Sequence, residues 1–501
     1  MKAYTLRARR IFIDSYQEPV IYMHKDCPVC RSEGFEAQSR VRVAFGRRSI
    51  IATLNVVMNG LLDHGEAGLS ESGWKALGVS PGVLLNISHA PPLDSLSYVR
   101  SKVYGHKLTA KACEAIVQDI SKGLYSDLHL ASFITACAGD RLDLDETVWL
   151  TESMIEVGER LTWGATPVVD KHCVGGLPGN RTTLIVVPIV AACGLCMPKT
   201  SSRAITSPAG TADTMEVLAP VDLDIATMQH VVSQTGACIA WGGAAALSPA
   251  DDILIRVERP LDLDSEGQLV ASVLSKKISA GSTHVLIDIP VGPTAKVRSA
   301  EAAEKLGRRL VDVGRQLRIE VALSITDGSQ PVGRGIGPAL EARDVLQVLQ
   351  RMPEAPADLR DRALSLAAQI LEFGGACRTG DGLGLAMQVL DSGRAWEKFV
   401  QICDAQGGLR EPPKALHTSE IVAAESGVVS RIDNRMLARA AKLAGAPKAP
   451  AAGVDMLVRL GDRVTQGQPL YVLHAMAPGE LDYALQFVRS RPPIVEFAEA
   501  G

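Results

Sequence analysis

The residues best suited to chemistry lie in the stretch Val168 to Glu216, where two polar loops flank one apolar segment. The first loop begins with Asp-Lys-His at residues 170–172 and continues into the glycine-rich turn Gly175 to Asn180. The second loop, Lys199 to Thr211, carries six hydroxyl side chains. Glycines let the backbone approach an anion, a helix N-terminus adds the positive end of its dipole, and lysine supplies a positive charge. The pattern is therefore typical of a site for phosphate or another oxyanion.

Two common phosphate motifs are absent from this stretch. Asn180 and Arg181 follow Gly179, which breaks the Gly-x-x-x-x-Gly-Lys-Ser/Thr pattern of the P-loop, and the stretch contains no Gly-x-Gly-x-x-Gly dinucleotide fingerprint. A glycine-rich turn that simply leads into a core helix has the same composition. The residue types alone leave both interpretations open.

The stretch contains Lys171-His172, GGLPGN at residues 175–180 and KTSSRAITSPAGTADTME at residues 199–216, and together these runs are long enough to be specific. With these runs the chain closely resembles the thymidine and pyrimidine-nucleoside phosphorylase family, and within it the longer branch that includes the archaeal AMP phosphorylases. The resemblance implies an α/β fold. In this fold a helical lobe and a lobe with a mostly parallel sheet are flanked by a small β-rich N-terminal domain and a C-terminal α+β domain.

The periodicity along the chain predicts elements of the same kinds. Alternating apolar and polar residues at the start are typical of β-strands, the segment Leu108 to Gly123 has helical spacing, and short apolar runs between helices predict buried parallel strands. We include LIVVPIV at residues 184–190 among those strands. The expected segments are a β-rich N-terminal domain (1–94), part of the helical lobe (95–167), the α/β phosphate- and nucleoside-binding lobe (168–351), a helical and α/β continuation (352–412), and a C-terminal α+β domain with lipoyl-like hairpins (413–501).

The resemblance assigns a cradle for phosphate and nucleotide to the central stretch. The candidate residues are Lys171, Gly176, Ser202, Arg203, Ala204, Ile205, Thr206, Ser207 and Thr211. His172 matches a base-contacting histidine and is a candidate catalytic residue, although a histidine with a purely structural role is the alternative. Where most of the family has Lys-His-Ser, this chain has Cys173, a poorer hydrogen-bond donor, for which Thr182 or Thr183 would compensate.

A second constellation contains the run SVLSKK. Its Ser272 and Lys276 are four residues apart, so on a helix they share one face, as needed to grip the two edges of a base. By resemblance, Asp264 is the catalytic proton donor, while an aspartate in a surface turn is the alternative interpretation. Two further substrate-binding candidates are Arg256, which is offset by one residue from the family's base-contacting arginine, and Lys296.

Phosphorolysis of a nucleoside transfers the sugar to inorganic phosphate through an oxocarbenium-like transition state. It needs a cationic cradle, donors that hold the base, and an acid for the leaving base. The resemblance implies a pentosyltransferase that converts thymidine and phosphate to thymine and 2-deoxyribose 1-phosphate. The alternative is an AMP phosphorylase that gives free base and ribose 1,5-bisphosphate. An anthranilate-type phosphoribosyltransferase and a carrier module fit less well, because a paired-acid motif for Mg²⁺ and a lysine at the carrier tip are missing from the sequence.

Composition limits the classes of partner. The 501 residues carry a net charge of −4, so we expect no nucleic-acid or membrane partner. The N-terminus lacks an apolar h-region and the most apolar segment is shorter than a membrane span, so we expect a cytoplasmic enzyme. The resemblance implies a homodimer or larger homo-oligomer that binds a nucleoside or nucleotide and phosphate. We expect no metal and no cofactor, because phosphorolysis requires no metal in principle and the sequence shows no acidic metal cluster. Inorganic phosphate is a co-substrate.

Ten cysteines include two pairs with C-x-x-C spacing. The second pair lies in an apolar segment, where cysteine is usually a small buried side chain. The C-x-x-C spacing of Cys27 and Cys30 leaves a zinc site open. It also leaves a thiol redox role open, because Lys25 and Arg31 would lower a thiol pKa.

Overall fold

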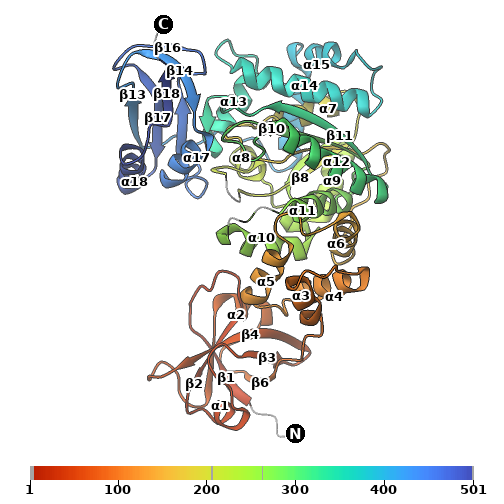
Figure 1. Cartoon of the computed structure of the whole chain (residues 1–501), viewed down its shortest axis with the longest axis vertical. Helices are drawn as coiled ribbons and strands as arrows, with labels where there is room; N and C mark the ends of the chain where they lie inside the picture. The colour runs from red at the N-terminus through yellow and green to blue at the C-terminus, as the bar shows by residue number, and fades with distance from the viewer. Residues whose placement is uncertain (1–4, 205–206, 262, 264, 499–501) are drawn as a thin grey trace. The chain divides into compact units, whose positions relative to one another are not determined.

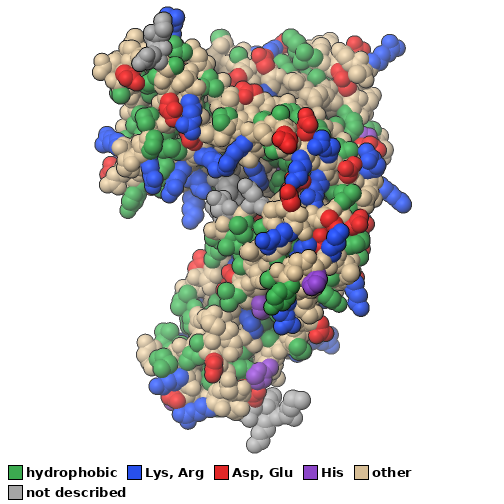
Figure 2. All heavy atoms as spheres, viewed as in Figure 1, with side chains coloured by type: hydrophobic (Ala, Val, Ile, Leu, Met, Phe, Trp, Pro, Cys, Tyr) green, Lys and Arg blue, Asp and Glu red, His purple; other side chains and the backbone are tan. Residues whose placement is uncertain are grey.

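The computed structural model describes residues 5–204, 207–261, 263 and 265–498. The chain forms two compact units. Unit 1 comprises Met1–Arg141 and Arg256–Leu263, and unit 2 comprises Leu142–Ile255 and Asp264–Gly501. Within the described residues, no helix is both long enough and apolar enough to cross a membrane. Figure 2 shows Lys and Arg side chains interspersed with Asp and Glu side chains over the face that it presents, in keeping with the small net charge.

Unit 1 begins with a closed β-barrel (Figure 1). The order of its strands is β1 (Thr5–Arg10), β5 (Glu66–Leu69), β2 (Val20–His24), β4 (Arg48–Val57), β3 (Arg40–Phe45) and β6 (Leu84–His89). Alternate side chains point inward, such as Leu6 and Ala8 of β1, and Val41 and Val43 of β3. The short helices α1 (Pro28–Glu33) and α2 (Glu71–Leu77) contribute to the same core. The expected β-rich N-terminal domain is confirmed.

Three helices follow the barrel in unit 1: α3 (Ser95–Val103), α4 (Ala110–Ser121) and α5 (Asp127–Cys137). Thr109 caps α4 by accepting the backbone N–H of Ala112, and Gly123 adopts a left-handed conformation (φ +68°) just beyond the end of α4. Arg40 of β3 links the barrel to this turn, because its guanidinium donates to the carbonyl oxygens of Gly123 and Leu124. The helix that the sequence predicts here is confirmed.

Unit 2 is built on parallel strands. β7 (Val169–Cys173), β10 (His284–Val291) and β11 (Glu320–Asp327) form a sheet with the order β11-β10-β7. β8 (Met197–Ser201) and β9 (Ala237–Trp241) form a parallel pair, and a parallel bridge between Val168 and Cys196 links this pair to β7. The predicted mostly parallel sheet is confirmed.

Helices cover both faces of this sheet, because alternate residues of β10 enter different cores. Val285 and Ile287 pack with α11 (Glu266–Ser279) and α12 (Ala300–Gln316). Leu286 packs on the other side with α7 (Thr183–Ala192) and α14 (Ala357–Phe373). A strand that is buried on both faces needs apolar side chains on both, which is why β10 lacks alternation. The other α-helices between residues 142 and 405 are α6 (Leu144–Glu156), α8 (Thr211–Leu218), α9 (Ile225–Thr235), α10 (Pro249–Leu261), α13 (Pro338–Leu349), α15 (Gly382–Asp391) and α16 (Arg394–Ala405).

One predicted strand is wrong. LIVVPIV at residues 184–190 lies within α7, which is buried on all sides, with Leu184, Val187 and Val190 each 0% exposed. An apolar run that is buried on every side has the same composition in a helix and in a central strand, so periodicity does not separate the two. Pro188 remains inside the helix although it removes one backbone donor.

The last part of unit 2 is an α+β domain with its own core, as expected. Its elements are β13 (His417–Val422), β14 (Gly427–Ile432), α17 (Asn434–Leu443), β15 (Gly453–Met456), β16 (Arg463–Val464), β17 (Pro469–Ala475), α18 (Pro478–Arg489) and β18 (Val495–Ala498). One sheet has the order β12-β15-β17-β13, in which β12 is Gly335–Ile336, and the other has the order β16-β14-β18. The strands of the segment expected to contain lipoyl-like hairpins are thus divided between two sheets.

Candidate active site

Strand β7 places the Asp-Lys-His run on two faces of the sheet, because successive side chains of a strand point in opposite directions. Lys171 is 1% exposed. Its ammonium donates to Thr182 Oγ1 at 2.8 Å and lies 3.5 Å from Asp288 Oδ2 of β10. Burial alone would raise the pKa of Asp288, but Lys171 and hydrogen bonds from Thr326 and Asn180 hold it below the usual range. Lys171 and Asp288 thus form a buried ion pair.

The other face of β7 carries Asp170 and His172. Asp170 accepts from Lys199 Nζ at 3.0 Å and from its neighbour's backbone N–H at 2.6 Å, and Lys277 Nζ lies 2.6 Å from its second oxygen. The half-buried His172 lies close to the lysines of this region. Burial holds the pKa of His172 well below its usual range, and four lysine charges lower it further: those of Lys277, Lys199, Lys171 and Lys276. The imidazole is therefore neutral at neutral pH.

Cys173 occupies the end of β7. Burial, together with the charge of Asp288, raises the pKa of Cys173 to about 12, so its sulfur is a protonated thiol at neutral pH. Asn180 Nδ2 donates to this sulfur at 3.4 Å. Thr182 is fully buried and its hydroxyl accepts from Lys171, so compensation by Thr182 or Thr183 stays a prediction.

The glycine-rich turn after β7 meets the loop after β10. Gly176 has φ +81°, and a side chain there would overlap the backbone N of Lys296 and lie 2.6 Å from its Cβ. Only glycine fits this conformation and this approach. The structure thus brings together two predicted site residues, Gly176 and the exposed Lys296, that are distant in sequence.

Arg181 fastens the glycine-rich turn to the second polar loop. Its guanidinium donates to Thr211 Oγ1 at 3.0 Å, to the carbonyl oxygen of Ala209 at 3.0 Å, and to Glu341 of α13 at 2.6 Å. The predicted site residue Thr211, at the start of α8, is therefore held against the turn that follows β7.

The second loop folds back on itself. Asp213 Oδ2 accepts the backbone N–H groups of Ala204 at 2.6 Å and Gly210 at 2.8 Å, and a side chain at Gly210 would lie 2.7 Å from the carbonyl oxygen of Ser202. Ser207 donates its hydroxyl proton to the carbonyl oxygen of Ala209. The predicted residues Ile205 and Thr206 lie outside the described residues.

Arg203 is surrounded by acidic side chains. Its guanidinium makes two hydrogen bonds to Glu216, one of them at 2.9 Å, lies 3.5 Å from Asp213, and stacks on Trp241 with 4.8 Å between Cζ and the ring centroid. The hydrogen bonding to Glu216 raises the pKa of Arg203, against a smaller opposing effect of burial. Its role as a substrate ligand stays a prediction.

Helix α11 confirms that Ser272 and Lys276 share a face. Ser272 Oγ donates to Asp251 Oδ2 at 3.0 Å, and Lys276 Nζ lies 2.5 Å from the same oxygen. Arg256 belongs to unit 1, where it pairs with both oxygens of Asp127, at 2.6 and 3.0 Å. Its substrate role stays a prediction.

Asp264, the predicted proton donor, lies outside the described residues. Of the residues that surround the site, the sequence analysis did not assign Lys199, Lys277, Asp170, Asp251 or Asp288. Lys277 lies in the SVLSKK run beside Lys276, so this motif could have identified Lys277 as a site residue. Within the described part of the chain, no group of three or more His, Cys, Asp or Glu side chains is arranged to hold a metal ion.

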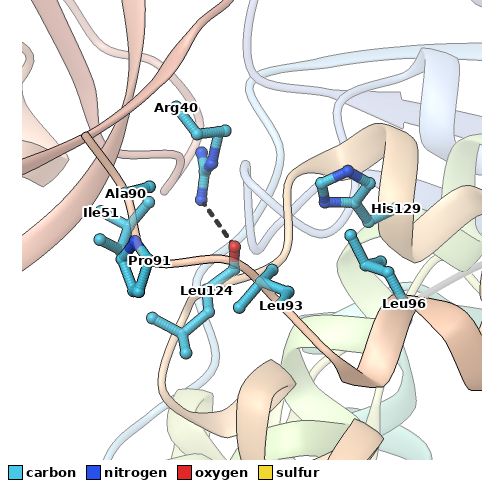
Figure 3. Close-up of a pocket in the computed structure, with 8 residues that line it drawn as sticks. All are labelled: Arg40, Ile51, Ala90, Pro91, Leu93, Leu96, Leu124 and His129. Carbon is cyan, nitrogen blue, oxygen red and sulfur yellow. Dashed lines mark hydrogen bonds between the residues drawn. The ribbon is translucent and has the colours of Figure 1, made fainter.

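Unit 1 contains a cavity of about 250 Å³ beside the barrel. Figure 3 shows Arg40 pointing toward the carbonyl oxygen of Leu124 on one side, with His129 and Leu96 on the other. The lining consists of residues other than the predicted site residues: Arg40, Ile51, Ala90, Pro91, Leu93, Leu96, Leu124 and His129. We therefore do not include this cavity in the candidate site.

Family comparisons cover the same segments. The model of the "Glycosyl transferase family, a/b domain" matches residues 165–396, and the helical bundle domain of that family matches residues 96–158. The "Pyrimidine nucleoside phosphorylase C-terminal domain" matches residues 428–494. The matched segments include every predicted site residue.

Individual relatives are similar over nearly the whole chain. "Putative thymidine phosphorylase 2" of Acidovorax sp. (strain JS42) is 68% identical over 99% of this chain and 96% of its own. "Putative thymidine phosphorylase" of Hahella chejuensis (strain KCTC 2396) is 59% identical over 98% of this chain and 97% of its own. Among solved structures, anthranilate phosphoribosyltransferase from Thermus thermophilus has a similar fold, with a TM-score of 0.51 and 18% identity over 62% of this chain and 98% of that chain.

The fold and these matches define the class: the chain is a glycosyl transferase with a helical bundle domain and an α/β domain. More narrowly, it belongs to the thymidine and pyrimidine-nucleoside phosphorylase family. The resemblance drawn from the sequence is confirmed.

Proposed function

We propose that the chain catalyses phosphorolysis of a pyrimidine nucleoside, converting thymidine and phosphate to thymine and 2-deoxyribose 1-phosphate. The observation that carries the proposal is the meeting of three loops at the carboxyl ends of parallel strands. The loop after β7 contacts the loop after β10 through Gly176 and Lys296, and contacts the loop after β8 through Arg181 and Thr211. This edge of a parallel sheet is where α/β folds bind their ligands.

The proposed phosphate cradle combines backbone and side chains. The glycine-rich turn supplies backbone N–H groups, Lys296 supplies an exposed cation, and the buried Lys171 supplies positive charge from beneath. His172 is a neutral imidazole, so it hydrogen-bonds a ligand without adding charge. Ser272 and Lys276, held together by Asp251, grip the base.

In the proposed reaction a phosphate oxygen attacks C1′ of the sugar as the C1′–N bond breaks. The electron pair of that bond leaves with the base, which must be neutralised by a proton or by hydrogen bonds. We assign the proton to Asp264 on the strength of the family resemblance.

The alternative substrate is a nucleoside 5′-monophosphate such as AMP. The run SSRAITSPAGT at residues 201–211 favours it by resemblance. Arg181 holds the described end of this run, Ala209 and Thr211, at the N-terminus of α8, where the positive end of the helix dipole favours a second phosphate.

A base-release assay tests the proposal. The enzyme is incubated in phosphate buffer with thymidine, uridine, cytidine, AMP, CMP or UMP, and free base is measured by chromatography. Thymine or uracil from nucleosides alone supports the proposal, and release from monophosphates alone replaces it with the alternative. Omission of phosphate is the control, since hydrolysis would continue without it and phosphorolysis would stop. We also propose a homo-oligomer, which light scattering of the purified protein would measure.

A further inference from the structure

Asp170 lies between two ammonium groups. Lys199 Nζ of β8 is 3.0 Å from one carboxylate oxygen, and Lys277 Nζ of α11 is 2.6 Å from the other. All three residues are almost fully buried, with 1–3% of their surface exposed. In the part of the chain that the structure describes, Asp170 is the one carboxylate within ion-pair distance of either lysine. The cluster therefore offers two positive charges for one negative charge.

This imbalance distinguishes the cluster from the other buried ion pairs of the site. Lys171, on the opposite face of β7, has Asp288 as its own carboxylate, and Arg181 has Glu341. An uncompensated charge in a protein interior is costly. The excess positive charge is removed when one lysine loses a proton, or it is balanced when an anion binds nearby. The cluster is thus suited to two charge states.

Lys199 has the lowered pKa that proton exchange near neutral pH requires. Burial lowers the pKa of Lys199 to about 7, and the Lys277 ammonium adds to this effect while Asp170 opposes it. The other titratable groups around it keep their charge state near neutral pH. Asp170 stays ionised because the two lysines hold its pKa low, His172 on β7 is neutral, and burial raises the pKa of the Cys238 thiol on β9. Without an anion, Lys199 is therefore mostly neutral at pH 8.

We propose that binding of an anion at the candidate active site is coupled to the uptake of one proton by Lys199. The link is electrostatic. His172 lies two residues from Asp170 on the same face of β7, and the charges of Lys199 and Lys277 both act on its half-buried imidazole, so an anion beside His172 lies in the field of the cluster. Its negative charge favours the ammonium form of Lys199. A neutral amine, one proton from solvent and the free anion become an ammonium group and a bound anion, and the charges balance.

The inference rests on the proposed function, which supplies phosphate as the anion. Sulfate is the better probe, because it does not titrate near neutral pH and any proton taken up then belongs to the protein. Binding is measured by calorimetry at pH 8 in two buffers that differ in ionisation enthalpy. We expect uptake of between about 0.5 and 0.9 proton per sulfate, since a group with a pKa of about 7 is roughly 10% protonated at pH 8.

Two variants distinguish proton uptake by Lys199 from the effect of removing a lysine elsewhere in the chain. Lys199→Met should bind sulfate with no proton uptake, whereas Lys398→Met on α16, whose lysine donates to the carbonyl oxygen of Thr235, should take up as many protons as the wild type. A wild-type pH series covers the case in which Lys199→Met fails to fold. Sulfate affinity should fall up to about tenfold per pH unit above pH 7 and level off below it.

The outcomes distinguish the two proposals. Sulfate binding without proton uptake in the wild type, or with an affinity independent of pH between 7 and 9, overturns the role of Lys199 while phosphorolysis still proceeds in the base-release assay. Failure to bind either sulfate or phosphate, together with no phosphate-dependent base release, overturns the proposed function and the inference with it.

Discussion

The buried pair Lys171–Asp288 allows stability and catalysis to be separated. In Lys171→Met, Asp288 loses its cation but keeps the hydrogen bonds from Asn180 and Thr326. Breaking a buried ion pair from one side costs about 3–5 kcal/mol, and we expect the lower end because these hydrogen bonds remain. The double variant Lys171→Met/Asp288→Asn removes both charges, so it should regain most of this loss and come within about 1 kcal/mol of the wild type.

Activity should not recover with stability. The proposed cradle loses a positive charge in both variants, so kcat/KM for phosphate should fall about 100-fold in each, which corresponds to about 2.7 kcal/mol of lost transition-state stabilisation. Chemical denaturation measures the free energy of unfolding. Initial rates against phosphate concentration at saturating nucleoside measure kcat/KM for phosphate. Lys398→Met is the matched control. A double variant with wild-type kcat/KM for phosphate would show that Lys171 serves structure alone and would refute the reasoning.

Three further perturbations test other parts of the site. Gly176→Ala should lower kcat/KM at least about tenfold, because the added Cβ overlaps the backbone of Lys296, and steady-state kinetics with a normal circular dichroism spectrum would show this. Arg181→Ala leaves Glu341 without its cation and should destabilise unit 2 by about 3 kcal/mol, measured by denaturation, whereas Arg181→Ala/Glu341→Gln should recover part of it. The pKa of His172 is lower in the folded than in the unfolded chain, so the unfolded chain binds more protons below about pH 6.5 and the free energy of unfolding falls as the pH drops. His172→Asn should flatten this dependence between pH 5 and 7, and an unchanged slope would contradict the assignment.

The sequence predicted the kinds of element better than the pairing of side chains. The parallel sheet and the shared face of Ser272 and Lys276 follow from local periodicity, and the structure has both. The apolar run 184–190 failed because a fully buried helix and a fully buried strand have the same composition.

The buried ion pairs could not be predicted from local sequence patterns. Lys277 meets Asp170 across 107 positions of sequence, and only the assembled sheet and α11 bring them together. Nothing in the local pattern indicated that Arg203 would be enclosed by Glu216, Asp213 and Trp241, since a basic residue in a polar loop is compatible with either a ligand or an internal partner. Partners distant in sequence follow from the fold, and the residue types alone do not specify them.

The guanidinium of Arg181 has a consequence for the order in which the chain matures. It donates to Ala209 and Thr211 and also to Glu341, which is made 160 residues later and supplies the opposite charge. During synthesis the polar loop therefore has its residues long before it has its anchor, and domains generally fold as units once their chain has emerged. A nascent chain that ends before α13 should contain the whole phosphate motif but lack the ion pair between Arg181 and Glu341. Capacity to bind would then arrive with α13, well after the last residue of the motif has left the ribosome.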